Sequence, residues 1–341
     1  MPIRILLVGA GAIGAFYASR LATVPNVLVS ALCRSNYKAV KANGFRISSP
    51  YYGDYVLRPE HAFGSPDEAR SLKREGSLRW DYLLVATKAL PDVSDDSALL
   101  ESLLDDQSSI VLIQNGIGIE EAYRRRFPRE TILSGVTIAS CAQPEPGLIK
   151  HNRWTKTDVG PYLPENSSST QAVQQTEQFV DLLKQSGIQD AKSWSHEDLQ
   201  FIRWHKIAIN ATMNPSAVLS GGAGNRELAL DPELAEHAKG VMNEVLAVAP
   251  VVLGKPLPDW LATPEQVLES VSKNMSGSRP SMWQDWEEGR RMELEVILGN
   301  PVRMARSRGL QMPRVQSMFA LLRKAQERGE RGRADPGGAK L

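Results

Sequence analysis

Short apolar runs alternate with helix-like segments along the first half of the chain. This alternation is typical of βαβ units, so it predicts a parallel sheet. A β-hairpin or similar excursion is expected at 45–59, followed by a charged loop up to about residue 80. The predicted strands are 3–8, 27–33, 81–87, 109–115 and 130–139, and the predicted helices are 12–22 and 35–44.

The pattern changes near residue 193. A polar capping run opens one more helix at 166–187, and 188–194 is the expected last edge strand. From Ser195 onward, helical segments are separated by Pro and Gly. The sequence therefore predicts an α/β Rossmann-type N-terminal domain (1–193), an all-α C-terminal domain (194–330) and a disordered, Gly- and charge-rich tail (331–341).

Composition narrows the functional class. The 341 residues suffice for two domains, and a net charge of +1 gives no general attraction to nucleic acid or to a membrane surface. Two cysteines and five scattered histidines show neither a disulfide framework nor metal-ligand spacing, so we expect no metal. No apolar run reaches the roughly 18–20 residues that span a bilayer, and we do not interpret the N-terminus as a signal peptide because its glycines suggest another role.

Those glycines form GAGAIG at 9–14, between a predicted strand and a predicted helix. In this context the pattern indicates a dinucleotide site. Gly9 allows a tight turn, Gly11 lets the backbone approach a pyrophosphate, and Gly14 permits close packing of helix and strand. We expect all six residues to bind cofactor: Gly9, Ala10, Gly11, Ala12, Ile13 and Gly14. The alternative is a glycine-rich turn without a ligand.

The end of the second strand indicates which cofactor. NAD enzymes commonly place an acidic residue there for the ribose hydroxyls, but this strand ends LCRSN. The Arg34 guanidinium can pair with a 2′-phosphate through two hydrogen bonds, whereas a carboxylate would repel it. The sequence therefore favours NADP(H) over NAD(H), and the alternative for Arg34 is a solvated surface charge.

Two further polar residues follow predicted strands. Lys88 comes after YLLVAT, and Asn115 ends LIQN and precedes two glycines. Open α/β sheets bind ligands at the carboxyl ends of their strands, so both residues are candidate cofactor ligands. An ordinary polar turn residue is an equally good interpretation of either one.

An apolar helix in the second half carries one polar stripe. Lys206, Asn210 and Asn214 follow each other at intervals of four residues, so they drift only about 40° per step around a helix. A lone lysine would more simply extend its ammonium to solvent. Two amides on the same narrow face make a substrate site the alternative, and the family resemblance described next favours that alternative.

Together these features resemble the ketopantoate reductase family. The resemblance rests on GAGAIG, VATK, LIQNGIG, K-x-x-x-N-x-x-x-NP and S-M-x-Q-D with a Glu eight residues after the Asp, in order over roughly 3–325. It implies a Rossmann domain joined to a helical domain of the 6-phosphogluconate dehydrogenase C-terminal type. It also implies NADPH-dependent reduction of 2-dehydropantoate to (R)-pantoate, on the route to pantothenate and coenzyme A.

The resemblance also assigns residue roles. Lys206 would be the general acid, and Glu293 would touch the cofactor and assist Lys206. Asn210, Asn214, Asn225 and Ser281, the last in the loop 278–281, would bind the substrate. Gly9 to Gly14, Lys88, Asn115 and the backbone of Cys141 would bind NADPH.

One departure leaves the substrate open. Bacterial members often have an Asn-Gly pair after the glutamate, whereas this chain has Gly299–Asn300 and looks more like the fungal branch. Some fungal relatives act on other 2-oxo acids such as 2-ketoisovalerate. A non-catalytic NADPH-binding sensor is an alternative from another class, although the intact Lys206 and Glu293 argue against it.

The sequence says less about cellular location and oligomeric state. We expect a cytoplasmic monomer or homodimer. The terminal Ala339-Lys340-Leu341 is close to the peroxisomal address S-K-L, and a chance tripeptide is at least as good an explanation.

Overall fold

A computed structural model describes residues 2–74, 76, 78–164, 167–275, 277 and 279–334, with side chains to 330. The chain divides into two units. The sheet unit comprises Met1–Gln114 and Ile119–Leu199, and the helical unit comprises Gln200–Leu341 together with the short segment Asn115–Gly118. That segment follows a strand of the sheet unit in the sequence, yet it packs with the helices.

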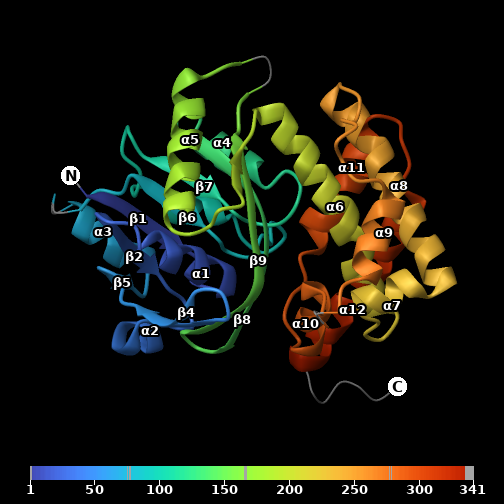
Figure 1. The fold of residues 1–341 in the computed structure, drawn as a ribbon, viewed down its shortest axis with the longest axis horizontal. Coiled ribbons are helices and arrows are strands. Elements are labelled where there is room, and N and C mark those ends of the chain that lie inside the picture. Colours follow the sequence, from blue (N-terminus) through green and yellow to red (C-terminus); the bar gives the residue numbers. More distant parts are fainter. Residues whose placement is uncertain are drawn as a thin grey trace. The chain divides into compact units, whose positions relative to one another are not determined.

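The sheet unit is built on ten strands of the described chain, in the order β4-β3-β9-β8-β7-β6-β1-β2-β5, with β10 beside β9 (Figure 1). They are β1 (Ile3–Val8), β2 (Val27–Leu32), β3 (Phe45–Ser49), β4 (Gly53–Leu57), β5 (Ala62–Phe63), β6 (Tyr82–Val85), β7 (Ser109–Leu112), β8 (Thr131–Glu145), β9 (Leu148–Pro161) and β10 (Ala191–Ser193).

The sheet is mixed, which corrects the prediction of a parallel one. Strands β5, β2, β1, β6, β7 and β8 are parallel to one another, as βαβ units require. The pair β8–β9 and the predicted hairpin β3–β4 are antiparallel. The expected charged loop contains helix α3 (Pro66–Arg74), whose acidic first turn and basic last turn complement the helix dipole.

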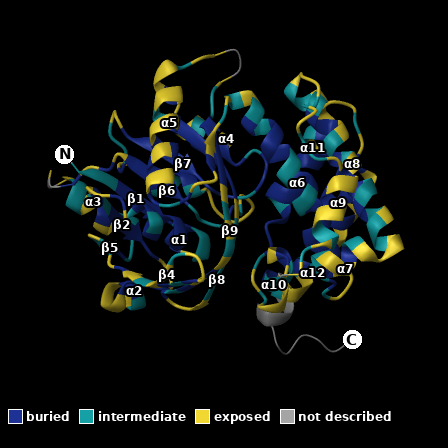
Figure 2. Ribbon diagram, viewed as in Figure 1, coloured by how far each residue is buried: buried dark blue, intermediate teal, exposed yellow. Residues whose placement is uncertain are grey.

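Both faces are buried at the centre of this sheet. Ile5 and Leu7 of β1 lie in one core with Phe16 of α1 (Ala12–Leu21) and Phe179 of α5 (Thr170–Gln185). Leu6, which points to the opposite face, is equally buried. Figure 2 shows this pattern as dark blue strands beneath helices with exposed outer faces. The remaining helices are α2 (Tyr37–Asn43), η1 (Asp96–Leu100) and α4 (Glu120–Arg126).

The helical unit is organised around α8, which packs against α7, α9, α11 and α12. Its elements are α6 (His196–Leu219), α7 (Asn225–Leu230), α8 (Pro232–Leu253), α9 (Pro264–Ser272), α10 (Ser281–Glu287), the π-helix η2 (Glu295–Gly299), α11 (Asn300–Ser307) and α12 (Pro313–Ala334). These two units confirm the predicted fold class. Among the described residues, no helix is long and apolar enough to cross a membrane.

Local sequence explains where several of these helices begin. Asp231 caps α8 by accepting a hydrogen bond from the Leu234 amide, and Thr263 forms a reciprocal capping box with Gln266 at α9. Helix α12 extends to Ala334, beyond the predicted limit at 330. The rest of the predicted tail, with Ala339-Lys340-Leu341, lies outside the described residues.

Candidate active site

The GAGAIG loop connects β1 to α1, and two of its glycines tolerate no side chain. Gly9 has φ +98°, and a Cβ there would lie 2.5 Å from the Thr87 amide nitrogen. A Cβ on Gly14 would lie 2.4 Å from the carbonyl oxygen of Gly9. Both contacts involve backbone atoms, which cannot shift cheaply, so this turn exists only with glycine at both positions.

Gly11 differs because open space lies in front of it. A Cβ built on Gly11 meets nothing within 4 Å, and no side chain caps the N-terminus of α1 at this residue. The amides of Ala12 and Ile13 begin that helix, where unpaired N–H groups and the helix dipole favour an anion. The geometry therefore fits a pyrophosphate.

Two side chains that the sequence reasoning missed hold this loop. The Asn36 amide donates to the Ala10 carbonyl at 2.7 Å, and Gln143 reaches the same oxygen at 3.4 Å. Asn36 is buried. A signal was present, because Asn36 follows Arg34 by two residues at the carboxyl end of β2.

The other predicted cofactor residues of the sheet unit follow its central strands. Arg34 is exposed just after β2, and Lys88 is half-buried after β6. Since β6, β1 and β2 are adjacent and parallel, their carboxyl ends share one edge with the glycine loop. Cys141 lies on β8 at a register shift, and burial raises the pKa of its thiol to about 12. That thiol therefore stays protonated.

The helical unit joins three predicted residues in one network. The Lys206 ammonium donates to Asn115 Oδ1 at 2.9 Å, and Asn115 Nδ2 donates to Glu293 Oε2 at 3.2 Å. An ammonium can only donate and a carboxylate only accepts, so the orientation of the bridging amide is fixed. The Asn115 side chain, a predicted cofactor ligand, thus links Lys206 and Glu293 through its oxygen and one N–H.

The charges around Lys206 set its acidity. Burial, together with the charge of the Arg203 guanidinium, lowers the pKa of Lys206 to about 8, although the Glu293 carboxylate opposes both effects. Glu293 is itself buried, with 8% of its surface exposed. Lys206 is therefore mostly protonated at neutral pH and is a stronger acid than an ordinary lysine, as a proton donor requires.

The other predicted substrate residues lie on three different helices and differ in their exposure. Asn210 and Asn214 follow Lys206 on α6, and Asn214 is only 5% exposed. Asn225 begins α7, and its buried Oδ1 has no hydrogen-bond partner in the described part of the chain. Ser281 begins α10 and is exposed, while Ser278 of the same loop lies outside the described residues.

Comparison with known proteins identifies the family of this chain. The family model Ketopantoate reductase PanE/ApbA matches residues 5–164, and the model of its C-terminal domain matches 198–326. The chain belongs to the ketopantoate reductase family. This membership, expected from the ordered motifs, makes it an NADP-dependent oxidoreductase that acts on CH–OH groups and reduces a 2-oxo acid.

Individual relatives extend the comparison. The crystal structure of a 2-dehydropantoate 2-reductase from Methylococcus capsulatus is 32% identical, with a TM-score of 0.81 over 96% of this chain and 98% of that one. An uncharacterized protein of Saccharomyces cerevisiae is 29% identical over 94% of this chain and 92% of its own length. A D-mandelate dehydrogenase solved with NADH and anilino(oxo)acetate shares the fold, with a TM-score of 0.79, 19% identity, and coverage of 96% and 99%.

In this ketopantoate reductase family member, the segment Asn115–Gly118 is anchored to the helices by its backbone. Arg203, 2% exposed, donates to the Gly116 carbonyl at 3.1 Å. The Ile117 amide donates to the Val296 carbonyl of the π-helix η2 at 2.9 Å. Asn300, part of the reversed Gly-Asn pair, donates to the Ile117 carbonyl at 2.7 Å. Sequence reasoning noticed the reversal but not this role, and it missed Arg203.

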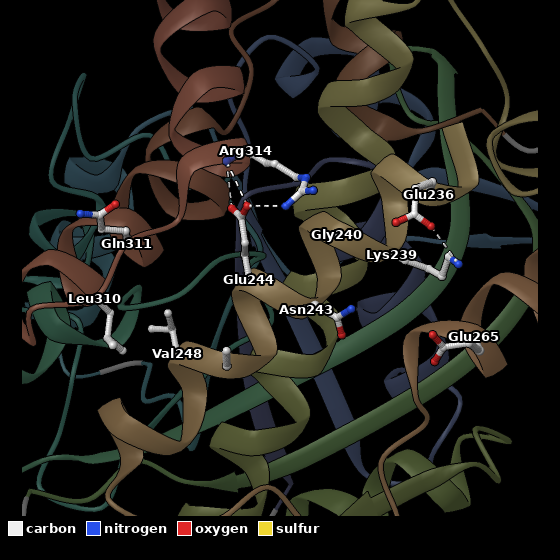
Figure 3. A pocket seen from close by; sticks show the side chains of 11 residues that line it. Glu236, Lys239, Gly240, Asn243, Glu244, Val248, Glu265, Leu310, Gln311 and Arg314 are labelled. Carbon is white, nitrogen blue, oxygen red and sulfur yellow. Dashed lines mark hydrogen bonds and ion pairs between the residues drawn. The ribbon is translucent and has the colours of Figure 1, made fainter. Parts of the chain in front are cut away.

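A cavity of about 550 Å³ in the helical unit is lined by residues of α8, α9, the loop before α12 and the start of α12 (Figure 3). None of the predicted site residues is among the described residues that line it. Its two cations are paired, Arg314 with Glu244 and Lys239 with Glu236. Glu244 also accepts hydrogen bonds from the first amides of α12, so these charges stabilise the helix packing.

Proposed function

We propose that this protein reduces 2-dehydropantoate to (R)-pantoate with NADPH, in the cytoplasm and on the route to pantothenate and coenzyme A. The observation that carries the proposal is the Lys206–Asn115–Glu293 network, in which a buried ammonium is held by an amide and balanced by a carboxylate. The family match supplies the reaction class, and the relative from Methylococcus capsulatus bears the name of this activity.

The reaction needs one hydride and one proton. NADPH, when bound, supplies the hydride that adds to the carbonyl carbon of the 2-oxo acid. Lys206 stabilises the negative charge that develops on the carbonyl oxygen and donates the proton to it. Lys206 then regains a proton from solvent, so the cycle restores the starting ammonium.

Neighbouring groups orient this proton donor and the substrate. Asn115 holds the Lys206 ammonium in place, and Glu293 favours its protonated form through charge. Asn210, Asn214 and Asn225 supply amides that can donate to substrate oxygens without adding charge, and Ser281 is proposed to meet the carboxylate. The buried Asn225 Oδ1, which accepts no hydrogen bond from the residues that the structure describes, fits a substrate donor such as a hydroxyl group.

We propose that Arg34 selects NADPH over NADH. It is exposed at the sheet edge that carries the glycine loop, and no acidic residue replaces it at the end of β2. A guanidinium pairs with a 2′-phosphate in a bidentate manner. Lys88 is proposed to meet the cofactor from the adjacent strand β6.

A substrate panel tests the proposal. Purified protein is assayed with NADPH and a series of 2-oxo acids that includes 2-dehydropantoate and 2-ketoisovalerate. The highest kcat/KM is expected for 2-dehydropantoate. An equal or higher value for 2-ketoisovalerate would assign a different 2-oxo acid, and NADPH binding without turnover on any member would indicate a non-catalytic sensor.

A further inference from the structure

Arg203 is a buried cation that the proposed reaction does not use directly. It precedes Lys206 by three residues on α6, so the two side chains leave the helix about 60° apart and less than one turn from each other. Arg203 is 2% exposed. Burying a second positive charge beside a lysine costs electrostatic free energy. We therefore ask which function of Arg203 offsets this cost.

One hydrogen bond of Arg203 indicates this function. Its Nη1 donates to the carbonyl of Gly116, and the preceding residue is Asn115, whose side chain holds both Lys206 and Glu293. The segment Asn115–Gly118 is fixed at three points, by Arg203 at Gly116, by Val296 at the Ile117 amide and by Asn300 at the Ile117 carbonyl. Of these three groups, Arg203 is the one that also carries a charge toward Lys206.

We infer that Arg203 is a positioning residue for the proton donor: it anchors the segment that orients Lys206, and its positive charge strengthens Lys206 as an acid. This inference rests on the proposed role of Lys206 in the reduction. The neutral amide of Asn115, from the segment, and the carboxylate of Glu293, from the residues before η2, also act on the ammonium. Arg203 and Glu293 therefore act in opposite directions on the same proton.

Three variants separate the two parts of the inference. Arg203→Lys keeps the charge, Arg203→Gln keeps an N–H donor without charge, and Arg203→Met removes both. Arg308→Met is the matched control, because Arg308 also donates to a backbone carbonyl, but to that of Val251 on α8. Circular dichroism and NADPH affinity verify that each variant is folded.

The readout is the pH profile of kcat/KM for reduction between pH 6 and 10. The alkaline limb is the fall of kcat/KM at high pH, where Lys206 loses its proton. We expect its midpoint to move to higher pH, by about 0.5–1 pH unit, in Arg203→Gln and Arg203→Met. It should stay in place in Arg203→Lys and Arg308→Met. At pH 7, kcat should fall about 10- to 100-fold in Arg203→Met and less in Arg203→Gln. A lower rate with an unmoved limb in both uncharged variants would overturn the electrostatic part, and an unchanged rate in Arg203→Met would overturn the anchoring part.

A second measurement does not depend on turnover. NMR follows the chemical shift of the Lys206 ε-carbon as a function of pH, in the wild type and in Arg203→Met. The signal is assigned by its loss in Lys206→Arg. We expect Lys206 to titrate at higher pH in Arg203→Met, and an unchanged titration would refute the inference. If Lys206→Ala proves active while this titration moves, the proposed function fails and the action of Arg203 on Lys206 still stands.

Discussion

The glycine loop of the sheet unit and the Lys206 network of the helical unit are built in opposite ways. The loop uses the backbone of six consecutive residues, and two of its glycines touch other backbone so closely that no side chain fits. The network uses side chains from segments that are 91 and 178 residues apart. A backbone site is thus encoded locally, whereas a side-chain site exists only after the helices have packed.

This difference predicts how each region fails. The loop should be damaged by adding atoms, because its function depends on space and on unpaired amides. The network should be damaged by removing atoms or charges, because each member holds or tunes another. Substitutions in the network should therefore leave NADPH affinity unchanged, because that affinity depends on the loop.

The largest effect is expected for Lys206→Ala. Removing the proton donor should lower kcat by about 10²–10⁴-fold, the usual contribution of general acid catalysis. NADPH affinity, measured by fluorescence titration, should be unchanged because the glycine loop is intact. Near-normal turnover would refute the acid role, and a parallel loss of NADPH affinity would break the separation of the two regions.

Gly14→Ala and Gly11→Ala test the loop as a matched pair. In Gly14→Ala the new methyl meets the Gly9 carbonyl, so we expect a lower melting temperature together with loss of NADPH binding. In Gly11→Ala the methyl enters open space, so the fold should remain stable while NADPH affinity falls about tenfold or more. Differential scanning fluorimetry and titration distinguish the two. Unaltered NADPH affinity in Gly11→Ala would contradict a pyrophosphate site there.

Arg34→Asp should change cofactor preference with little effect on the chemistry. We expect NADPH affinity to fall about 10- to 100-fold, since a bidentate charged pair is lost and a repulsive carboxylate is added. NADH affinity should change less. Lys192→Asp, at an exposed lysine on β10, is the control for net charge. Equal losses for both cofactors would show that Arg34 does not read the 2′-phosphate.

The contrast between the two regions also explains what the sequence could predict. Strands β1, β2, β6 and β7 are short apolar runs, so their identity was plain from local pattern, and so was the loop after β1. Strand β9 was missed because Lys150, Asn152 and Lys156 occupy three of its four exposed positions, and because it is defined by its pairing with β8. That pairing is not a local property of either strand.

The Lys206 network was predictable in part for the same reason. The four-residue spacing on α6 indicated a polar face, and the position of Asn115 after β7 indicated a site residue. The choice of Lys206 and Glu293 as partners of Asn115 depends on how distant segments pack, which no local pattern encodes. Arg203 escaped notice because it lies three residues before Lys206, outside the four-residue stripe, although this spacing also places side chains side by side.

The smallest effect is expected for Glu293→Gln, and its sign is the informative part. The carboxylate raises the pKa of Lys206, so its neutralisation should lower that pKa further and move the alkaline limb of kcat/KM to lower pH. The rate at pH 7 should fall only about tenfold, because Gln can still accept the hydrogen bond from Asn115. Glu295→Gln, at a carboxylate paired with Arg303, is the control and should leave the limb in place. Arg203→Met should move the limb in the opposite direction, to higher pH. If Arg203→Met and Glu293→Gln moved it in the same direction, the claim that these two charges act oppositely on Lys206 would be wrong.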